Sequence, residues 1–199
     1  MKKKAKKPLD YKGIPMDSKP ELDFCHYLEE LKQAGFIQVW ERAPTYTLTK
    51  GFEIEYIHTQ ELKTKTKETE RKQVLLRESV YTPDFKIIWN RKAIGVFVET
   101  IPSLIVGKKP QTRPFLCNVD WTSYIEVKPS STFDVDGMLR VFKMNQKFMW
   151  KIHSIFVNLI VPPDLFCSTF TPQGVNIPMD RKEKAPKWPR VTLKEYANG

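Results

Sequence analysis

The segment Tyr124-Ile125-Glu126-Val127-Lys128 is the most informative stretch of the chain, because it places two charged side chains on an otherwise apolar strand. Side chains at positions i and i+2 leave an extended strand on the same face. Glu126 and Lys128 therefore share one face, while Ile125 and Val127 point to the opposite, core-facing side. Such a strand needs other elements to cover its apolar face, so its neighbours in the sequence indicate the class of fold.

The neighbouring segments alternate between helix and strand patterns. Residues 18–35 predict a helix. Ser18 caps its start, Glu21 completes a capping box, and Gly35 ends the helix. The other expected elements are strands at 36–40, 45–49, 81–89, 94–98 and 155–161, and a second helix at about 136–153. We expect 94–98 to pair antiparallel with 81–89. This order of elements predicts an α/β fold with a mixed sheet flanked by helices.

The remaining segments surround this core. The predicted organisation is a basic N-terminal arm at 1–17, a main domain at 18–161 with insertions at about 52–80 and 102–120, and a Pro-rich basic tail at 162–199. Residues 63–67 alternate with period two, which indicates an exposed hairpin. Each insertion is interpreted either as a substrate-selecting arm or as a dimerisation element, and the sequence does not choose between them.

The net charge of +10 is concentrated at the two ends of the chain. Residues 1–12 hold six Lys against one Asp, and residues 181–199 hold six basic against two acidic side chains. Tails of this kind suit phosphate contacts with DNA, or else they are solubilising ends. Trp188, within the basic tail, is a candidate for contact with a base or a partner.

Several classes of protein are excluded. No apolar run reaches the length of a membrane span, and we expect no secretory signal after the lysine-rich start. The three cysteines, at 25, 117 and 167, are widely spaced and are predicted to be free buried thiols in a reducing, cytoplasmic compartment. Neither a P-loop nor a dinucleotide fingerprint occurs, so no nucleotide cofactor is expected.

The candidate chemistry lies at the ends of two strands. Asp84 follows Pro83 at one strand, and Glu126 and Lys128 stand on another. Two convergent carboxylates make an oxygen-rich site suited to Mg²⁺ or Mn²⁺, and a nearby ammonium can orient a water molecule. The competing interpretation is a simple ion pair between Glu126 and Lys128 on a half-exposed strand.

These segments resemble the PD-(D/E)XK superfamily, the restriction-endonuclease-like nucleases. The likeness rests on Ser18-x-x-Glu21, Pro83-Asp84, Glu126-Val127-Lys128, and a following helix that carries Lys143 and Gln146. The chain looks most similar to small endonucleases of phages and mobile elements and to Holliday-junction-resolvase-like enzymes. The resemblance spans roughly 18–161 and implies a core with the order αβββαβ.

The resemblance also implies roles for individual residues. Asp84 and Glu126 would ligate the metal together with the backbone carbonyl of Val127. Lys128 would position the attacking water. Glu21 would complete the acidic cluster or help to bind a second metal, although its part in the capping box is a sufficient explanation for it.

On the same grounds Lys143 and Gln146 would contact the substrate, although a solvated helix position explains Gln146 equally well. The resemblance thus implies a Mg²⁺-dependent DNA endonuclease of branched or recombination DNA, working in a bacterial host cell and encoded by a phage or mobile element. Cutting both strands would call for a homodimer. The alternative is a non-catalytic DNA-binding or assembly subunit of a phage or transposition complex that keeps the fold.

Overall fold

The computed structural model describes residues 9–101, 113–129, 137–180, 182 and 184–198. The chain divides into two compact units, residues 1–43 with 83–199, here called the main unit, and residues 44–82, here called the ribbon unit. The expected insertion at 52–80 falls within the ribbon unit. Most of the expected insertion at 102–120 lies outside the described residues.

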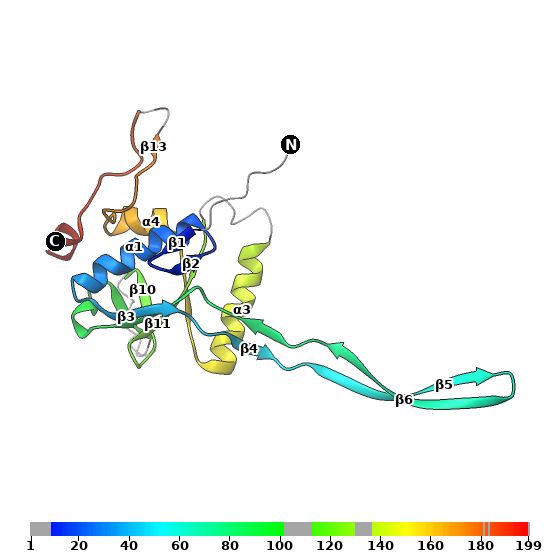
Figure 1. Cartoon of the computed structure of the whole chain (residues 1–199). Helices are drawn as coiled ribbons and strands as arrows, with labels where there is room; N and C mark the ends of the chain where they lie inside the picture. The colour runs from blue at the N-terminus through cyan, green and yellow to red at the C-terminus, as the bar shows by residue number, and fades with distance from the viewer. Residues whose placement is uncertain (1–8, 102–112, 130–136, 181, 183, 199) are drawn as a thin grey trace. The chain divides into compact units, whose positions relative to one another are not determined.

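The main unit contains most of the regular structure (Figure 1). Its helices are α1 (Lys19–Gln33), η1 (Arg91–Ala93), α3 (Met138–His153), α4 (Pro162–Ser168) and α5 (Leu193–Asn198). Its strands are β1 (Leu9–Tyr11), β2 (Ile14–Met16), β3 (Ile37–Arg42), β8 (Phe85–Trp89), β9 (Val98–Thr100), β10 (Phe115–Cys117), β11 (Thr122–Val127), β12 (Val157–Ile160), β13 (Met179–Asp180) and β14 (Ala185–Pro186).

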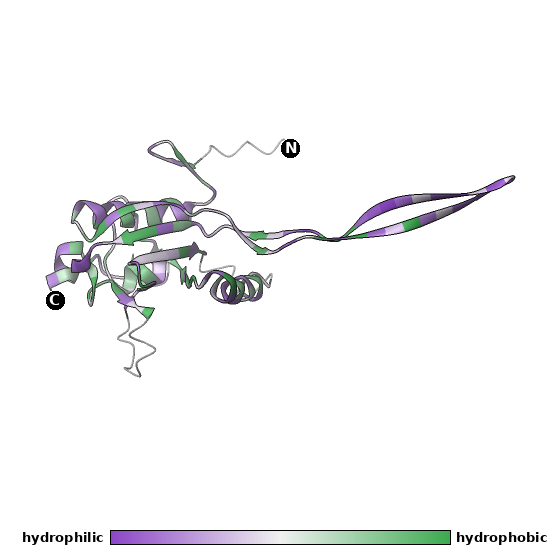
Figure 2. Ribbon diagram, turned by 90° about the horizontal axis from the view of Figure 1, so that it is seen from below, coloured by the Kyte–Doolittle hydropathy of each residue, from purple (hydrophilic) through white to green (hydrophobic). Residues whose placement is uncertain are grey.

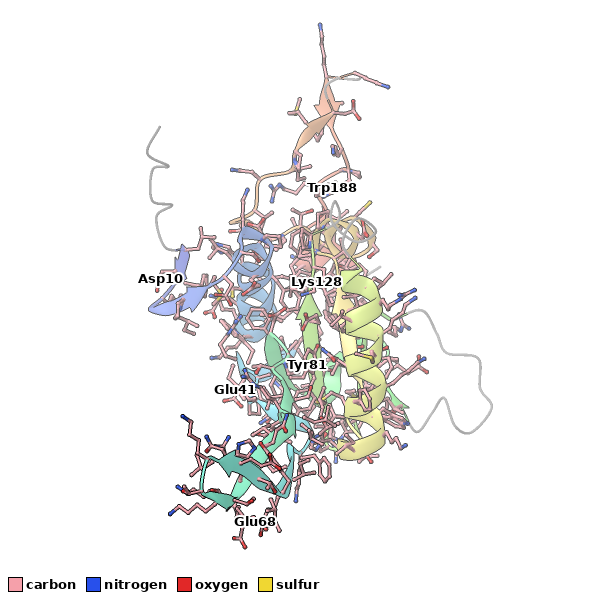
Figure 3. All side chains as sticks on the ribbon, turned by 90° about the vertical axis from the view of Figure 1, so that its right-hand side faces the viewer. Asp10, Glu41, Glu68, Tyr81, Lys128 and Trp188 are labelled. Carbon is pink, nitrogen blue, oxygen red and sulfur yellow. The ribbon has the colours of Figure 1, made fainter. Side chains whose placement is uncertain are left out.

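A four-stranded sheet with the order β12-β11-β8-β3 forms the centre of the main unit. β8 is antiparallel to both β3 and β11, whereas β11 and β12 are parallel and are joined through α3. Figure 3 shows α1 and α3 on opposite sides of this sheet. The expected α/β class with a mixed sheet is therefore confirmed, and the main sheet and its two helices follow the chain order αβββαβ.

α1 forms where the capping signal predicts it. The Ser18 side chain accepts a hydrogen bond from the backbone N–H of Glu21, and Pro20 occupies the first turn. The buried face of the helix packs on the sheet, with the Phe24 and Phe85 rings 5.4 Å apart. Because the apolar residues recur at helical spacing, one face of α1 packs into the core and the other is exposed to solvent.

Two expectations for the strands are wrong. Residues 94–98 do not pair with 81–89; instead β9 pairs in parallel with β10, which the sequence did not indicate. The expected strand at 81–89 is broken, because β7 (Ser79–Tyr81) ends before Pro83 and β8 begins after Asp84. Proline lacks the N–H that a strand ladder requires, so the interruption at Pro83 has a local cause.

Both ends of the chain contribute to the core. β1 and β2 form a small hairpin that buries Tyr11 and Met16, within the segment expected as an arm. In the C-terminal part Phe170 is fully buried, and Trp188 is buried with its indole N–H donating to Thr171 Oγ1 at 3.0 Å. Trp188 is thus a packing residue rather than the exposed contact expected for it.

The cysteines only partly match the expectation. Cys25 and Cys117 are buried free thiols, whereas Cys167 is exposed. Cys167 lies near the end of the short helix α4, which the sequence did not predict and which begins at Pro162. Proline is well tolerated in the first turn of a helix, so the Pro162-Pro163 pair starts this helix instead of merely ending the preceding strand.

The ribbon unit consists of paired strands. β4 (Tyr46–Thr49) pairs with β7, and β5 (Phe52–Leu62) pairs antiparallel with β6 (Lys65–Leu76). The expected hairpin is present, and its turn lies between Leu62 and Lys65. Along β5 and β6, hydrophilic stretches alternate with shorter hydrophobic ones (Figure 2).

Candidate active site at the ends of two strands

Asp84 lies at the entrance of β8, directly beside the exit of β11. The two strands are antiparallel, and their last registered pair is Ile125 with Phe85. Asp84 and Glu126 are each one residue further along. The backbone N–H of Val127 donates a hydrogen bond of 2.7 Å to Asp84 Oδ2. The sheet register therefore brings together two segments that are more than forty residues apart in the chain.

Glu126 and Lys128 form an ion pair at this point. The Lys128 Nζ to Glu126 Oε1 distance is 2.5 Å. Glu126 is buried, with 7% of its surface exposed, whereas Lys128 is more accessible. Because positions i and i+2 share a face, the strand geometry places the ammonium beside the carboxylate without any further element. The predicted shared face of Glu126 and Lys128 is thus present.

The carboxyl group of Asp84 is in an environment that disfavours its charge. Burial and the nearby carboxylate of Glu126 raise its pKa to about 7, well above the ordinary range of an aspartate, with a smaller contribution from Glu21. The Val127 N–H and the Lys128 ammonium act in the opposite direction. A carboxyl group with so high a pKa marks a place where added positive charge would be stabilising.

Glu21 reaches the same region from α1 but has partners of its own. Its Oε2 lies 2.9 Å from Arg42 Nη1 and also accepts from the Asp17 N–H at 3.3 Å, while its Oε1 accepts a hydrogen bond of 2.8 Å from Ser18 Oγ. The capping box and the Arg42 ion pair thus occupy both oxygens of this buried carboxylate. Glu21 influences Asp84 electrostatically and holds the start of α1 in place.

The oxygen donors at the strand ends suit one hard divalent cation. In an antiparallel ladder, the N–H and the carbonyl of one residue face the same neighbour, so the Val127 carbonyl faces the Asp84 side of β11. The donor set is then Asp84, Glu126 and this carbonyl, which is the chemistry that Mg²⁺ and Mn²⁺ prefer. Among the described residues no group of three or more His, Cys, Asp or Glu side chains is arranged to hold a metal.

The two expected substrate contacts on α3 behave differently. Lys143 is exposed to solvent. Gln146 donates a hydrogen bond of 2.6 Å from Nε2 to the backbone carbonyl of Val157, at the start of β12. Val157 pairs with Tyr124, two residues before Glu126. Gln146 therefore ties α3 to the sheet through its amide nitrogen.

Arg42 is the residue of this region that the sequence did not single out. It binds both Glu21 and Asp17, and its guanidinium lies over the Phe85 ring at 5.2 Å from the centroid. Its position opposite Phe85 follows from the pairing of β3 with β8. A lone arginine at the end of a strand carries no signal in the sequence, because its role depends on which strand becomes its neighbour.

Comparison of the chain with protein-family models, with curated proteins and with solved structures finds no match. Within the described part of the chain, no helix has both the length and the apolar character needed to cross a lipid bilayer. The case for a function therefore rests on the residues at the ends of β8 and β11.

Proposed function

We propose that this protein is a metal-dependent DNA endonuclease that hydrolyses phosphodiester bonds. The observation that carries the proposal is the meeting of Asp84, Glu126 and Lys128 at the ends of two adjacent antiparallel strands. Burial, together with the repulsion between its charge and that of Glu126, raises the pKa of Asp84 to about 7, and a divalent cation would relieve that repulsion.

Each residue has a definite part in this proposal. Asp84, Glu126 and the Val127 carbonyl would hold Mg²⁺ or Mn²⁺, which when bound supplies Lewis-acid stabilisation of charge on the phosphate. Lys128 orients the attacking water, and its ion pair with Glu126 fixes the position of the ammonium. Glu21 and Arg42 tie the start of α1 to β3 beside the site.

The test is cleavage of supercoiled plasmid, linear duplex and branched DNA by the full chain with Mg²⁺ or Mn²⁺. We expect Glu126→Ala to lower the cleavage rate by at least about 100-fold, the scale on which positioned catalytic groups act. Glu41→Gln is the matched control, because Glu41 is an exposed acid on β3 that pairs with Lys86. If Glu126→Ala cuts as fast as the wild type, the nuclease assignment is wrong.

A non-catalytic DNA-binding or assembly role is the second candidate. It is favoured by the Glu126–Lys128 ion pair, which satisfies both groups without metal, and by the lack of a three-ligand cluster among the described residues. Retention of DNA with no cleavage of any of the three substrates in either metal would select this role. Isothermal titration calorimetry with Mn²⁺ separates the candidates independently. Only the nuclease requires a bound ion, and Glu126→Ala should then abolish Mn²⁺ binding.

The partners and location proposed with this function follow from its chemistry. The substrate is DNA, and a cut in both strands would require a two-fold homodimer that presents two sites. The place of action is the cytoplasm of a bacterial cell, where chromosomal and phage DNA are both accessible. Sedimentation of the purified chain with and without branched DNA measures the oligomeric state directly.

A further inference from the structure

The hairpin of β5 and β6 sorts its charges by face. Directly paired residues of an antiparallel ladder lie on the same face, and successive residues alternate between faces. Residues 53–74 contain five acidic and five basic side chains, so their summed charge is zero. Apart from Lys63, which lies in the turn, the register of the hairpin nevertheless separates these charges onto two different surfaces.

One surface, here called the basic face, has three basic side chains and no acidic one. It comprises Ile54, Tyr56, His58, Gln60, Leu62, Lys65, Lys67, Thr69, Arg71 and Gln73. The opposite surface, the acidic face, has five acidic side chains and one basic one. It comprises Glu53, Glu55, Ile57, Thr59, Glu61, Thr66, Glu68, Glu70, Lys72 and Val74.

The end-on view in Figure 3 agrees with this register. Glu68 lies where oxygen-tipped side chains gather, and nitrogen-tipped side chains gather on another side of the ribbon. The basic residue of the acidic face, Lys72, is held by Glu55, with 2.7 Å between Nζ and Oε1. The basic face therefore presents Lys65, Lys67 and Arg71 with no carboxylate among its own residues.

Solubility alone does not explain this separation. A two-stranded ribbon needs polar side chains on both faces, but opposite charges facing each other across the strands would meet that need and stabilise the pairing. Placing acidic and basic side chains on separate faces removes most of these cross-strand pairs of opposite charge. It creates one surface that attracts a polyanion and a reverse side that a polyanion repels, so the ribbon is oriented toward its partner.

We infer that the basic face of the β5–β6 ribbon binds the groove and backbone of duplex DNA. Eleven paired positions extend over about 35 Å at ordinary strand rise, and the major groove admits a two-stranded ribbon. Lys65, Lys67 and Arg71 would contact phosphates, while Ile54, Tyr56 and Leu62 supply apolar surface for base edges and thymine methyl groups. This inference rests on the proposed function insofar as it takes DNA as the partner.

The experiment measures binding of the full chain to a labelled 30-base-pair duplex by fluorescence anisotropy over a series of KCl concentrations. EDTA is present, so cleavage plays no part. For the triple variant Lys65→Gln, Lys67→Gln, Arg71→Gln, we expect at least about tenfold weaker binding and a salt slope reduced by about 2 to 3, since each phosphate contact contributes about 0.9. The charge-preserving variant Lys65→Arg, Lys67→Arg, Arg71→Lys should bind like the wild type.

The matched control neutralises three acids of the other face, Glu61→Gln, Glu68→Gln and Glu70→Gln. We expect its affinity to stay within about twofold of the wild type. An unchanged affinity in the variant that replaces Lys65, Lys67 and Arg71 by glutamine would overturn the inference. So would a gain in the control as large as the loss in that triple variant, because binding would then follow net charge and not the face.

Two further outcomes are distinguishable. If the triple variant keeps its DNA affinity but loses self-association in sedimentation, the basic face contacts a second copy of the chain and the DNA assignment is wrong. If the ribbon binds duplex as expected but the wild type cuts no DNA in Mg²⁺ or Mn²⁺, the nuclease proposal fails while this inference stands. If the wild type cuts DNA but the glutamine triple variant binds duplex as tightly as the wild type, the nuclease proposal stands and this inference fails.

Discussion

A single carboxyl group, that of Asp84, shows most clearly how the site depends on its surroundings. It is close enough to Glu126 for the two charges to repel, and it accepts the Val127 N–H. The same hydrogen bond that fixes the side chain also favours its charged form, yet burial and repulsion outweigh it and raise the pKa to about 7. In the absence of metal, Asp84 is therefore a source of instability at neutral and alkaline pH.

The pH dependence of folding follows from that pKa. Between about pH 4 and pH 7 the folded chain retains a proton on Asp84 that the unfolded chain has released, so the free energy of unfolding falls as the pH rises. We expect Asp84→Asn to increase the free energy of unfolding by about 2 kcal/mol at pH 8 in EDTA, and by much less at pH 4. Urea denaturation at the two pH values measures this difference.

The control for this prediction is Glu41→Gln, which removes an exposed acid from β3. Its effect on unfolding should be within about 0.5 kcal/mol at both pH values, as for most surface substitutions. A stabilisation by Asp84→Asn that is equal at pH 4 and pH 8 would show that the gain is not electrostatic. The electrostatic account of Asp84 would then have to be abandoned.

At the scale of elements, the first turn of α1 connects helix formation to the site. Ser18 Oγ accepts the Glu21 N–H at 3.4 Å and donates to Glu21 Oε1 at 2.8 Å. Arg42, from β3, completes the environment of Glu21. The capping box thus has a second consequence, because it holds a buried carboxylate near the ends of β8 and β11.

We expect Ser18→Ala to lower the free energy of unfolding by about 1 kcal/mol, the usual cost of losing an N-cap hydroxyl. Ser18→Thr keeps the hydroxyl and should restore most of that loss. Thermal or urea unfolding followed by circular dichroism measures both variants. If the Ser18→Ala and Ser18→Thr variants prove equally stable, the hydroxyl makes no contribution to the cap and the assigned role of Ser18 is wrong.

At the scale of the whole main unit, the C-terminal segment packs against α1. The rings of Tyr27 and Phe170 are stacked with their centroids 4.3 Å apart, and the backbone N–H of Gln173 donates to Glu30 Oε1 at 2.5 Å. Gly174 lies so close to His26 that an added Cβ would be 2.5 Å from its Nδ1. The tail therefore depends on a residue without a side chain at this contact.

We expect Gly174→Ala to destabilise the chain by about 1 to 3 kcal/mol, because a methyl group inserted into a packed contact forces its neighbours to move. In the His26→Ala background the same substitution should cost less than half as much. A double-mutant cycle on the free energy of unfolding measures the coupling. Additive effects of the two substitutions would show that the close approach of Gly174 to His26 is not what limits the packing.

Local signals explain why so much of the main unit was predictable. The capping residues before α1, the apolar periodicity of α1 and α3, and the alternation of charged and apolar residues in β11 are all properties of short segments. Proposing Asp84 and Glu126 as partners needed the order of elements as well. The pairing of β9 with β10 escaped prediction because a parallel pair of three-residue strands has no local signature.

The ribbon unit shows the limit of reasoning from composition. Its summed charge of zero between residues 53 and 74 points to no partner, and the basic ends of the chain account for most of the net charge of the protein. The separation into an acidic and a basic face exists only once Leu62 is paired with Lys65 and each later pair follows. A shift of one residue in that register would mix the two faces.

Local patterns in the sequence were enough to predict the capped helix, the strand that carries Glu126 and Lys128 on one face, and the α/β class. Only the folded chain shows the contacts themselves: Asp84 accepts the Val127 N–H, Arg42 binds Glu21, Trp188 is buried, and the ribbon has two faces of opposite charge. The physical reason is range. Periodicity and capping act within a few residues, whereas electrostatic repulsion, burial and strand register arise between segments that only folding brings together.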